Sequence, residues 1–315
     1  MAREWIEFIQ SQELPWEQSI ERNGVEFKTL SLDSDTGAVS QLLRYPVGWS
    51  DDNLHHLSVD EEFLVLDGEL MINDETYSSM AYAHFPAGFT RKGFSSELGA
   101  IVLTFFSATF TRTEGKGKYD EQRLVPHLDT FEVPYTGNFH PEFPPGAGRK
   151  SLYTDPITED QTWILGTMPL RWAERQEVHP IVEEMYLLSG EVHGNRGVMR
   201  PGAYFWRPPE IPHGPYGTLT GNLYLFRTKG GKLSTNYIDT DYQFQWWPKY
   251  DPALPENLKS FARETAIAPK PWEENELPLS SGVGAYPKHL MLCQMSNPRN
   301  ISSGSTTDLL TNVAP

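Results

Sequence analysis

The sequence predicts an all-β protein in which one structural unit occurs twice. Its 315 residues include 25 glycines and 25 prolines, which are spread along the chain and leave room only for short helices. Short segments with strand character recur between these breaks, and one of them is repeated 122 residues further along. Strands at such spacing, separated by turn signals, are typical of a β-sandwich or β-barrel.

The expected strands are short and fall into two groups. They lie at residues 40–45, 62–66, 100–106, 184–188, 202–206 and 223–227. A helix is expected only near the C-terminal end, at 256–265, where Leu258, Phe261 and Ala262 recur at helical spacing. The chain should therefore contain very little helix.

The repeat divides the chain. Residues 61–69, EEFLVLDGE, recur as residues 183–191, EEMYLLSGE, at an offset of 122. The same offset aligns Pro86 with Pro208 and Gly99 with Gly221, which indicates two copies of one β-rich unit. We expect an N-terminal domain at 1–125, a second domain at 126–250 that begins with a mostly irregular connector, and a mostly irregular C-terminal extension at 251–315.

Composition limits the partners. The net charge of −16 disfavours binding to nucleic acid and to anionic membrane surfaces, and no segment is long and apolar enough to span a membrane. Cys293 is the single cysteine, so no internal disulfide can form. The charged N-terminal residues do not resemble a signal peptide. We expect a cytoplasmic protein.

The repeat carries motifs that resemble those of the cupin superfamily, specifically a bicupin. The second copy contains the spacing of the two cupin motifs as Glu177-Val178-His179, Glu183 and Gly190, followed by Gly202, Pro208-Pro209-Glu210 and His213. The first copy contains Gly48, Leu54-His55-His56, Glu61, Gly68, Pro86-Ala87-Gly88 and Arg91. The second copy is similar to the zinc-binding cupin domain of bacterial anti-sigma factors and to dihydroxyacetophenone dioxygenase. The resemblance implies two jelly-roll β-barrel domains in tandem.

The second copy is expected to bind one divalent metal ion. Side chains alternate along a strand, so Glu177 and His179 share a face, and Glu183 and His213 would join them from other segments. Imidazole with carboxylate suits Fe(II), which we favour, as well as Zn, Mn or Ni. Where the family usually has histidine, this chain has Glu177, which is expected to act as a fourth ligand or as the catalytic proton acceptor.

The first copy keeps only part of this ligand set. His56 and Glu61 occupy ligand positions, but Leu54 and Arg91 replace the other two. Because an arginine is always cationic, Arg91 would repel a metal ion and could pair with Glu61 instead. His55 and His84 could complete the site only if the strand register slipped. We expect the first domain to have lost its metal and to serve a structural or dimerising role.

The substrate pocket is expected around the second site. Met185 shares the face of Glu183, while Tyr204 and Trp206 share a face one strand further on, and Arg171 precedes the ligands. The leading hypothesis is a mononuclear iron(II) dioxygenase that acts on a small aromatic ketone, diketone or enol. The alternatives are a zinc-binding sensor without catalysis and a metal-dependent isomerase or lyase. The expected partners are a small-molecule substrate and, from the resemblance, a second copy in a homodimer.

Overall fold

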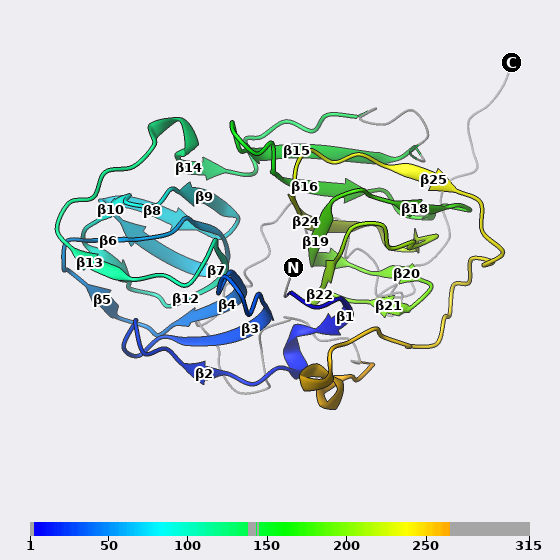
Figure 1. Cartoon of the computed structure of the whole chain (residues 1–315), viewed down its shortest axis with the longest axis horizontal. Helices are drawn as coiled ribbons and strands as arrows, with labels where there is room; N and C mark the ends of the chain where they lie inside the picture. Colours follow the sequence, from blue (N-terminus) through cyan, green and yellow to red (C-terminus); the bar gives the residue numbers. More distant parts are fainter. Residues whose placement is uncertain (1–2, 138–142, 144, 265–315) are drawn as a thin grey trace, which may run out of the picture.

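The computed structural model describes residues 3–137, 143 and 145–264, and most of its regular structure is β-strand (Figure 1). The all-β fold class is thereby confirmed. The expected helix at 256–265 forms only a short 3-10 helix, η3 (Glu256–Phe261), and Thr265 lies outside the described residues. None of the described helices is long and apolar enough to cross a membrane. Cys293 and residues 265–315 of the predicted extension also lie outside the described part.

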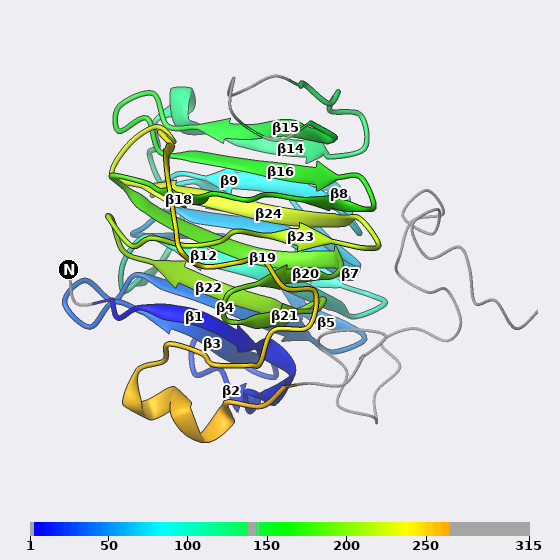
Figure 2. The same cartoon turned by 90° about the vertical axis from the view of Figure 1, so that its right-hand side faces the viewer.

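Each repeat is built around one large sheet, and the two large sheets have the same strand order. The sheet of the first repeat runs β14 (Val125–Asp129), β9 (Ala81–Phe85), β7 (Glu61–Ile72), β12 (Ala100–Phe106), β4 (Val39–Tyr45) and β3 (Glu26–Leu32). The sheet of the second repeat runs β1 (Ile6–Gln10), β22 (Ala203–Arg207), β19 (Val182–Gly190), β24 (Asn222–Lys229), β16 (Gln161–Thr167) and β15 (Ala147–Thr154), as Figure 2 shows. All six predicted strands lie in these sheets.

The remaining strands are short. In the first repeat they are β2 (Glu17–Gln18), β5 (Trp49–Asp51), β6 (His55–Leu57), β8 (Glu75–Ser78), β10 (Thr90–Arg91), β11 (Phe94–Ser96) and β13 (Arg112–Glu114). In the second they are β17 (Arg171–Trp172), β18 (Gln176–Val178), β20 (Val192–Gly194), β21 (Gly197–Met199), β23 (Gly217–Thr218) and β25 (Asn236–Ile238). Strand β2 extends the first large sheet beyond β3, and β5, β8 and β11 are also joined to that sheet through β7 and β11. The chain also forms the 3-10 turns η1 (Ser11–Glu13) and η2 (Glu121–Arg123).

The two repeats exchange their first strands, which corrects the predicted domain boundaries. Strand β1 precedes the first repeat but pairs with β22 of the second, and β14 precedes the second repeat but pairs with β9 of the first. Figure 1 shows β1, in dark blue, beside the green strands of the second repeat. The predicted boundary at 125/126 therefore falls inside β14, and residues 6–10 belong to the sheet of the second domain. Repeat matching missed both strands because neither has a conspicuous sequence counterpart.

Two kinds of apolar core result from this arrangement. One cluster joins the outer faces of the two large sheets and includes Leu64 with its repeat equivalent Tyr186, and Leu103 with Leu225. A second cluster fills the interior of the first repeat, and a third, smaller one lies inside the second repeat. Alternation along the strands explains this division, because successive side chains point to opposite faces.

The repeat extends to backbone detail at Gly68 and Gly190. Both have positive φ angles, 70° and 75° respectively. A Cβ atom at Gly68 would lie 1.9 Å from the carbonyl oxygen of Gly99, and one at Gly190 would lie 2.0 Å from that of Gly221. Only glycine fits such a close approach between strands. The offset of 122 aligns Gly68 with Gly190 and Gly99 with Gly221.

Candidate metal centre

Glu177 and His213 are held side by side by paired backbone hydrogen bonds. Glu177 lies in the middle of β18, and His213 follows the bend at Pro208–Pro212. The Glu177 amide donates to the His213 carbonyl at 3.0 Å, and the His213 amide donates to the Glu177 carbonyl at 3.1 Å. In an antiparallel pair of this kind the two side chains lie on the same face.

His179 and Glu183 complete the cluster from the turn that joins β18 to β19. His179 is two residues beyond Glu177 and so lies on the same face of the extended chain, as predicted. Its carbonyl accepts a hydrogen bond from the Glu210 amide at 2.8 Å, which connects the turn to the proline-rich bend before His213. Glu183 is the second residue of β19 and is buried.

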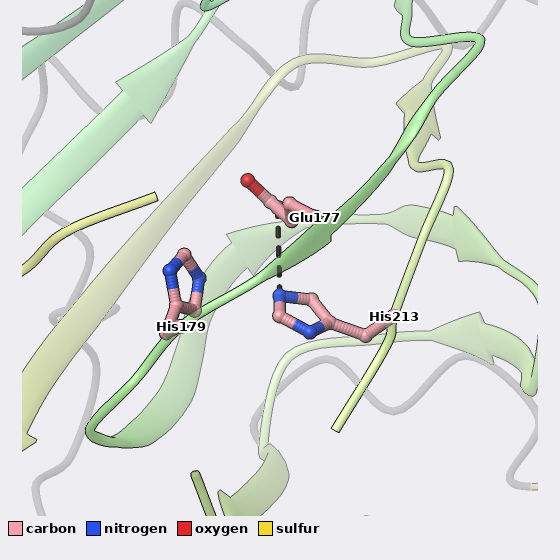
Figure 3. Close-up of side chains that lie close together, drawn as sticks. All are labelled: Glu177, His179 and His213. Atoms are coloured by element: carbon pink, nitrogen blue, oxygen red, sulfur yellow. Dashed lines mark ion pairs between the residues drawn. The ribbon is translucent and has the colours of Figure 1, made fainter. Parts of the chain in front are cut away.

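The side chains of Glu177, His179 and His213 point toward one another (Figure 3), and their candidate ligand atoms all lie within 4.8 Å. His213 Nε2 lies 3.7 Å from both Glu177 Oε1 and Glu183 Oε2. His179 Nε2 lies 3.6 Å from Glu183 Oε1. Ligands about 2.1 Å from one ion are roughly 3 to 4 Å apart. Glu177, His179 and His213 therefore have a spacing close to that of a single metal centre, and Glu183 lies within 3.7 Å of both histidines but outside that group of three.

The two imidazoles are oriented as metal ligands. His179 Nδ1 lies 2.9 Å from the Ser234 carbonyl oxygen, and His213 Nδ1 lies 2.8 Å from that of Ile211. Because a carbonyl only accepts, each Nδ1 carries the proton and each Nε2 keeps a free lone pair. Both Nε2 atoms are buried and have no hydrogen-bond partner among the described residues. Two buried nitrogens with unused lone pairs that face carboxylates fit a divalent cation.

Glu183 is shared between this cluster and an arginine. Arg207 Nη1 donates to Glu183 Oε2, and Arg207 Nε donates to Glu7 Oε2 at 2.7 Å. Arg207 is only 2% exposed, so its positive charge is offset by the two carboxylates rather than by water. Glu7 reaches the site on the exchanged strand β1. Of the four predicted ligands, Glu183 is therefore the one with a competing ion pair.

Burial and charge set the protonation of the cluster. Burial lowers the pKa of His213 well below its ordinary value, and the positive charge of Arg207 lowers it further. Burial raises the pKa of Glu177, and Glu183 adds to the rise, although His179 opposes it. Both shifts disfavour the charged form of a group taken out of water. A neutral His213 is the form that can bind a metal.

A cavity of about 300 Å³ opens beside the cluster. Glu177, His179 and Glu183 lie in its wall. The Glu177 side chain is 21% exposed, against 2% for His213, so it is the ligand most accessible from the cavity. Aromatic side chains form much of the remaining wall, namely Phe143, Trp163, Phe205, Tyr216, Tyr224, Phe226 and Tyr237.

The structure corrects part of the predicted pocket. Arg171 lines the cavity as expected. Met185 lies in the apolar cluster inside the second repeat, on the face of Glu183, but is not part of the cavity wall. Tyr204 and Trp206 lie on the opposite face of β22, in the cluster between the two repeats. Their neighbours Phe205 and Arg207 point into the cavity instead, because Phe205 pairs with Met185 and Arg207 with Glu183 across the sheet.

The equivalent position in the first repeat is closed by ion pairs. Glu61 Oε2 accepts from Arg91 Nη2 at 2.8 Å, the pairing that the sequence predicts, and Glu61 Oε1 accepts from Arg22 Nη2 at 2.7 Å. His84 is stacked on Tyr153 at 4.0 Å, on the face toward the second repeat. Within the described ranges, Glu177, His179 and His213 form the single cluster of three candidate ligands.

Comparisons with known proteins agree with this architecture. Residues 6–109 match the ChrR cupin-like domain family. A proposed dioxygenase from Nostoc punctiforme superimposes with a TM-score of 0.68 at 18% identity, covering 77% of this chain and 92% of the other. Oxalate decarboxylase from Bacillus subtilis superimposes with a TM-score of 0.51 at 12% identity, covering 74% and 78%. The fold is that of a bicupin. The sequence matches no curated protein.

The family match and the candidate metal centre fall on different repeats of this bicupin. The matched residues 6–109 cover the first repeat, in which Glu61 forms ion pairs with Arg22 and Arg91. The cluster of candidate metal ligands around Glu177 belongs to the second repeat. The sequence motifs resemble those of cupins in both repeats, with the fuller ligand set in the second. Both observations are consistent with one duplicated cupin unit whose copies have diverged in their interiors.

Sequence reasoning missed three side chains at or beside the candidate metal centre. Glu7 lies outside the region of internal similarity, and no local motif links it to a residue 200 positions away. Arg207 directly follows the predicted strand at 202–206, and its place on the inner face is set by the register of β22 with β19, which pairs it with Glu183. The cavity residue Arg149 was likewise missed, although it directly precedes Lys150, which the repeat aligns with Lys28.

Proposed function

We propose that this bicupin is a mononuclear metal-dependent oxidoreductase, specifically an iron(II) dioxygenase that acts on a small aromatic ketone, diketone or enol. The observation that carries the proposal is the pair of buried Nε2 lone pairs of His179 and His213, which face the carboxylates of Glu177 and Glu183. Two imidazoles with one or two carboxylates form the donor set of non-haem iron sites. The same donors also accept Zn, Mn or Ni.

His179, His213 and Glu177 would hold the ion, with Glu183 as the fourth ligand. When bound, a divalent ion supplies a Lewis acid that polarises a chelating carbonyl, and iron(II) in addition supplies redox chemistry toward oxygen. Two imidazoles leave the charge of the ion to be balanced by the carboxylates. Because Arg207 donates a hydrogen bond to Glu183 Oε2, it neutralises part of the negative charge that Glu183 would otherwise offer to the metal ion.

Glu177 is the ligand in the best position to move a proton. It lies in the cavity wall and is the most exposed of the four side chains. A carboxylate at that place could accept a proton from the acidic carbon of a diketone or from an enol hydroxyl. The aromatic wall would bind a flat substrate and exclude water around it.

Two features of the comparisons support an enzyme of this class. The neighbours in structure are described as a proposed dioxygenase and as oxalate decarboxylase, and the latter is described with Mn(II) centres. At 18% and 12% identity they show the fold alone, so the reaction rests on the site. The cavity, with its largely aromatic wall, favours an apolar ring over a sugar acid.

The experiment is to purify the protein, measure bound metals by mass spectrometry, restore iron(II) and record oxygen uptake with a panel of diketones and phenolic ketones. One metal per chain and oxygen consumption with at least one compound are expected. A stoichiometric content of zinc, with no oxygen consumed by any compound, would instead favour the zinc-binding sensor. Conversion of a substrate without oxygen uptake would favour an isomerase or lyase.

A further inference from the structure

Arg149 lies in the cavity wall and has no carboxylate partner among the described residues. It is half-buried on β15, and its Cζ atom lies 4.3 Å from the centre of the Trp163 ring. Its Nε atom is buried and has no hydrogen-bond partner in the described part of the chain, where Arg149 also forms no ion pair. Burial lowers the pKa of Arg149, and no acidic side chain in the described ranges opposes that effect. A cation left in this state is costly unless something else supplies a negative charge.

The internal repeat shows that the fold does not need an arginine at this position. Arg149 pairs with Leu165 across β15 and β16, and Phe27 pairs with Leu43 at the equivalent place in the first repeat. Phe27 packs against the apolar interior of that repeat. The second repeat thus carries a cation where the first carries a phenyl ring. The difference occurs in the repeat that has the cavity and the candidate metal centre.

The charged side chains of the whole cavity wall also favour an anionic ligand. Its cationic side chains are Arg149, Arg171, Arg175, Arg207 and Lys232, and its carboxylates are Glu177 and Glu183. Two carboxylates just outside the wall, Glu7 and Asp239, pair with Arg207 and Arg175, so five cations face four carboxylates and the site keeps a small local excess of positive charge in a chain of net charge −16. A divalent ion on the two histidines would make the cavity more positive. Such a cavity attracts an anion.

From these observations we infer that the substrate is an organic anion: an aromatic ketone or diketone that carries a carboxylate remote from the metal-chelating oxygens, and Arg149 binds that carboxylate. The planar guanidinium stays stacked on Trp163 while its N–H groups donate to the carboxylate oxygens. Trp163 and Phe226, whose rings are stacked at 5.4 Å, form an adjacent wall for the substrate ring. The inference rests on the proposed function for the chelating part of the substrate, but not for the carboxylate.

The test is calorimetric binding of 4-acetylbenzoate and 3-benzoylpropionate, each compared with its own methyl ester. The acids are expected to bind at least about tenfold more tightly than the esters, the difference that one charge-assisted contact supplies. In Arg149→Met, acid binding should fall to the level of the ester and ester binding should stay unchanged. Arg149→Lys should keep part of the preference. Equal binding of acid and ester by the natural protein would overturn the inference without any variant.

Arg196→Met provides the matched control. Arg196 also lies over a tryptophan, Trp5, at 5.3 Å, but it is outside the cavity wall. This variant should keep the full preference for the acids. Loss of the preference in both variants, or its persistence in Arg149→Met, would show that Arg149 is a structural cation only.

Repeating the measurement after metal removal separates this inference from the proposed function. Arg149 is not a metal ligand, so the acid-over-ester preference should survive in chelator-treated protein. A preference that survives in a protein that never binds iron would leave the inference standing and remove the proposed dioxygenase. One bound iron per chain without any preference for the acids over their esters would leave the proposed dioxygenase standing and remove the inference about Arg149.

Discussion

Glu62 and Glu184 lie 122 residues apart and accept hydrogen bonds from the same guanidinium. Arg227 Nε donates to Glu62 Oε2 at 2.9 Å, and Arg227 Nη1 donates to Glu184 Oε2 at 2.6 Å. The two glutamates occupy the same position in the two repeats. Arg227 itself lies 3.9 Å above the ring of Phe105, its own repeat equivalent. One buried cation therefore links both copies of the unit at the centre of their interface.

Arg227→Met is expected to weaken the contact between the repeats severely. The variant leaves two buried carboxylates without their cation, which costs about 3–5 kcal/mol in the free energy of unfolding. Urea denaturation followed by tryptophan fluorescence measures the loss. As a control, Arg44→Met removes a more exposed ion pair with Glu26 and should cost less than about 1 kcal/mol. Equal losses in the two variants would contradict a special role for Arg227.

The same network predicts acid sensitivity. Burial alone would raise the pKa of Glu62, but Arg227 and the hydrogen bonds from Thr162 and Tyr82 outweigh it and lower the pKa to about 2. A carboxyl whose pKa is depressed in the folded state stabilises the protein above its unfolded pKa of about 4.3, and this stabilisation disappears as the pH falls toward 2. Unfolding free energies measured from pH 5 to pH 2 should fall less steeply in Glu62→Gln. Identical slopes in the two proteins would refute this source of acid sensitivity.

The exchanged strand β1 is expected to tune the metal centre through Glu7. In Glu7→Gln, Arg207 loses one of its two carboxylates and its charge bears more strongly on Glu183. Metal affinity should fall roughly tenfold, the size of effect that residues behind metal ligands have. Competition with a chromophoric chelator measures the affinity. Glu4→Gln, three residues earlier and exposed, should leave it unchanged, and an unchanged affinity in Glu7→Gln would show that Arg207 does not influence the ion.

The large sheets and the ligand cluster could be predicted from the sequence because they depend on the spacing of residues along the chain. Strand alternation places Glu177 and His179 on one face, and the repeat fixes the register of Glu183 with Glu61. The exchange of strands β1 and β14 between the repeats could not be predicted from the sequence. Strands β1 and β14 pair with segments far away in the sequence, and neither carries a pattern that names its partner.

Tyr204 and Trp206 show where composition misleads. Large aromatic side chains near a ligand suggest a pocket, yet these two lie between the repeats, where Tyr204 donates a hydrogen bond to Glu184 at 2.6 Å. The inner face of β22 carries Phe205 and Arg207 instead. The faces of β22 are set by its register with β19, which pairs Glu183 with Arg207 and which strand alternation alone does not give. An arginine on an inner face also contradicts the usual expectation for a core.

The most direct test of the candidate metal centre is the metal content of three variants beside the natural protein. His179→Ala and His213→Ala each remove one buried Nε2 ligand, and His56→Ala changes the histidine that the repeat aligns with His179. Circular dichroism confirms that each variant is folded. Mass spectrometry should find one divalent ion per chain in the natural protein and in His56→Ala, and less than about a tenth of that in the other two. Full metal content in His179→Ala and His213→Ala would contradict a centre formed by Glu177, His179, Glu183 and His213.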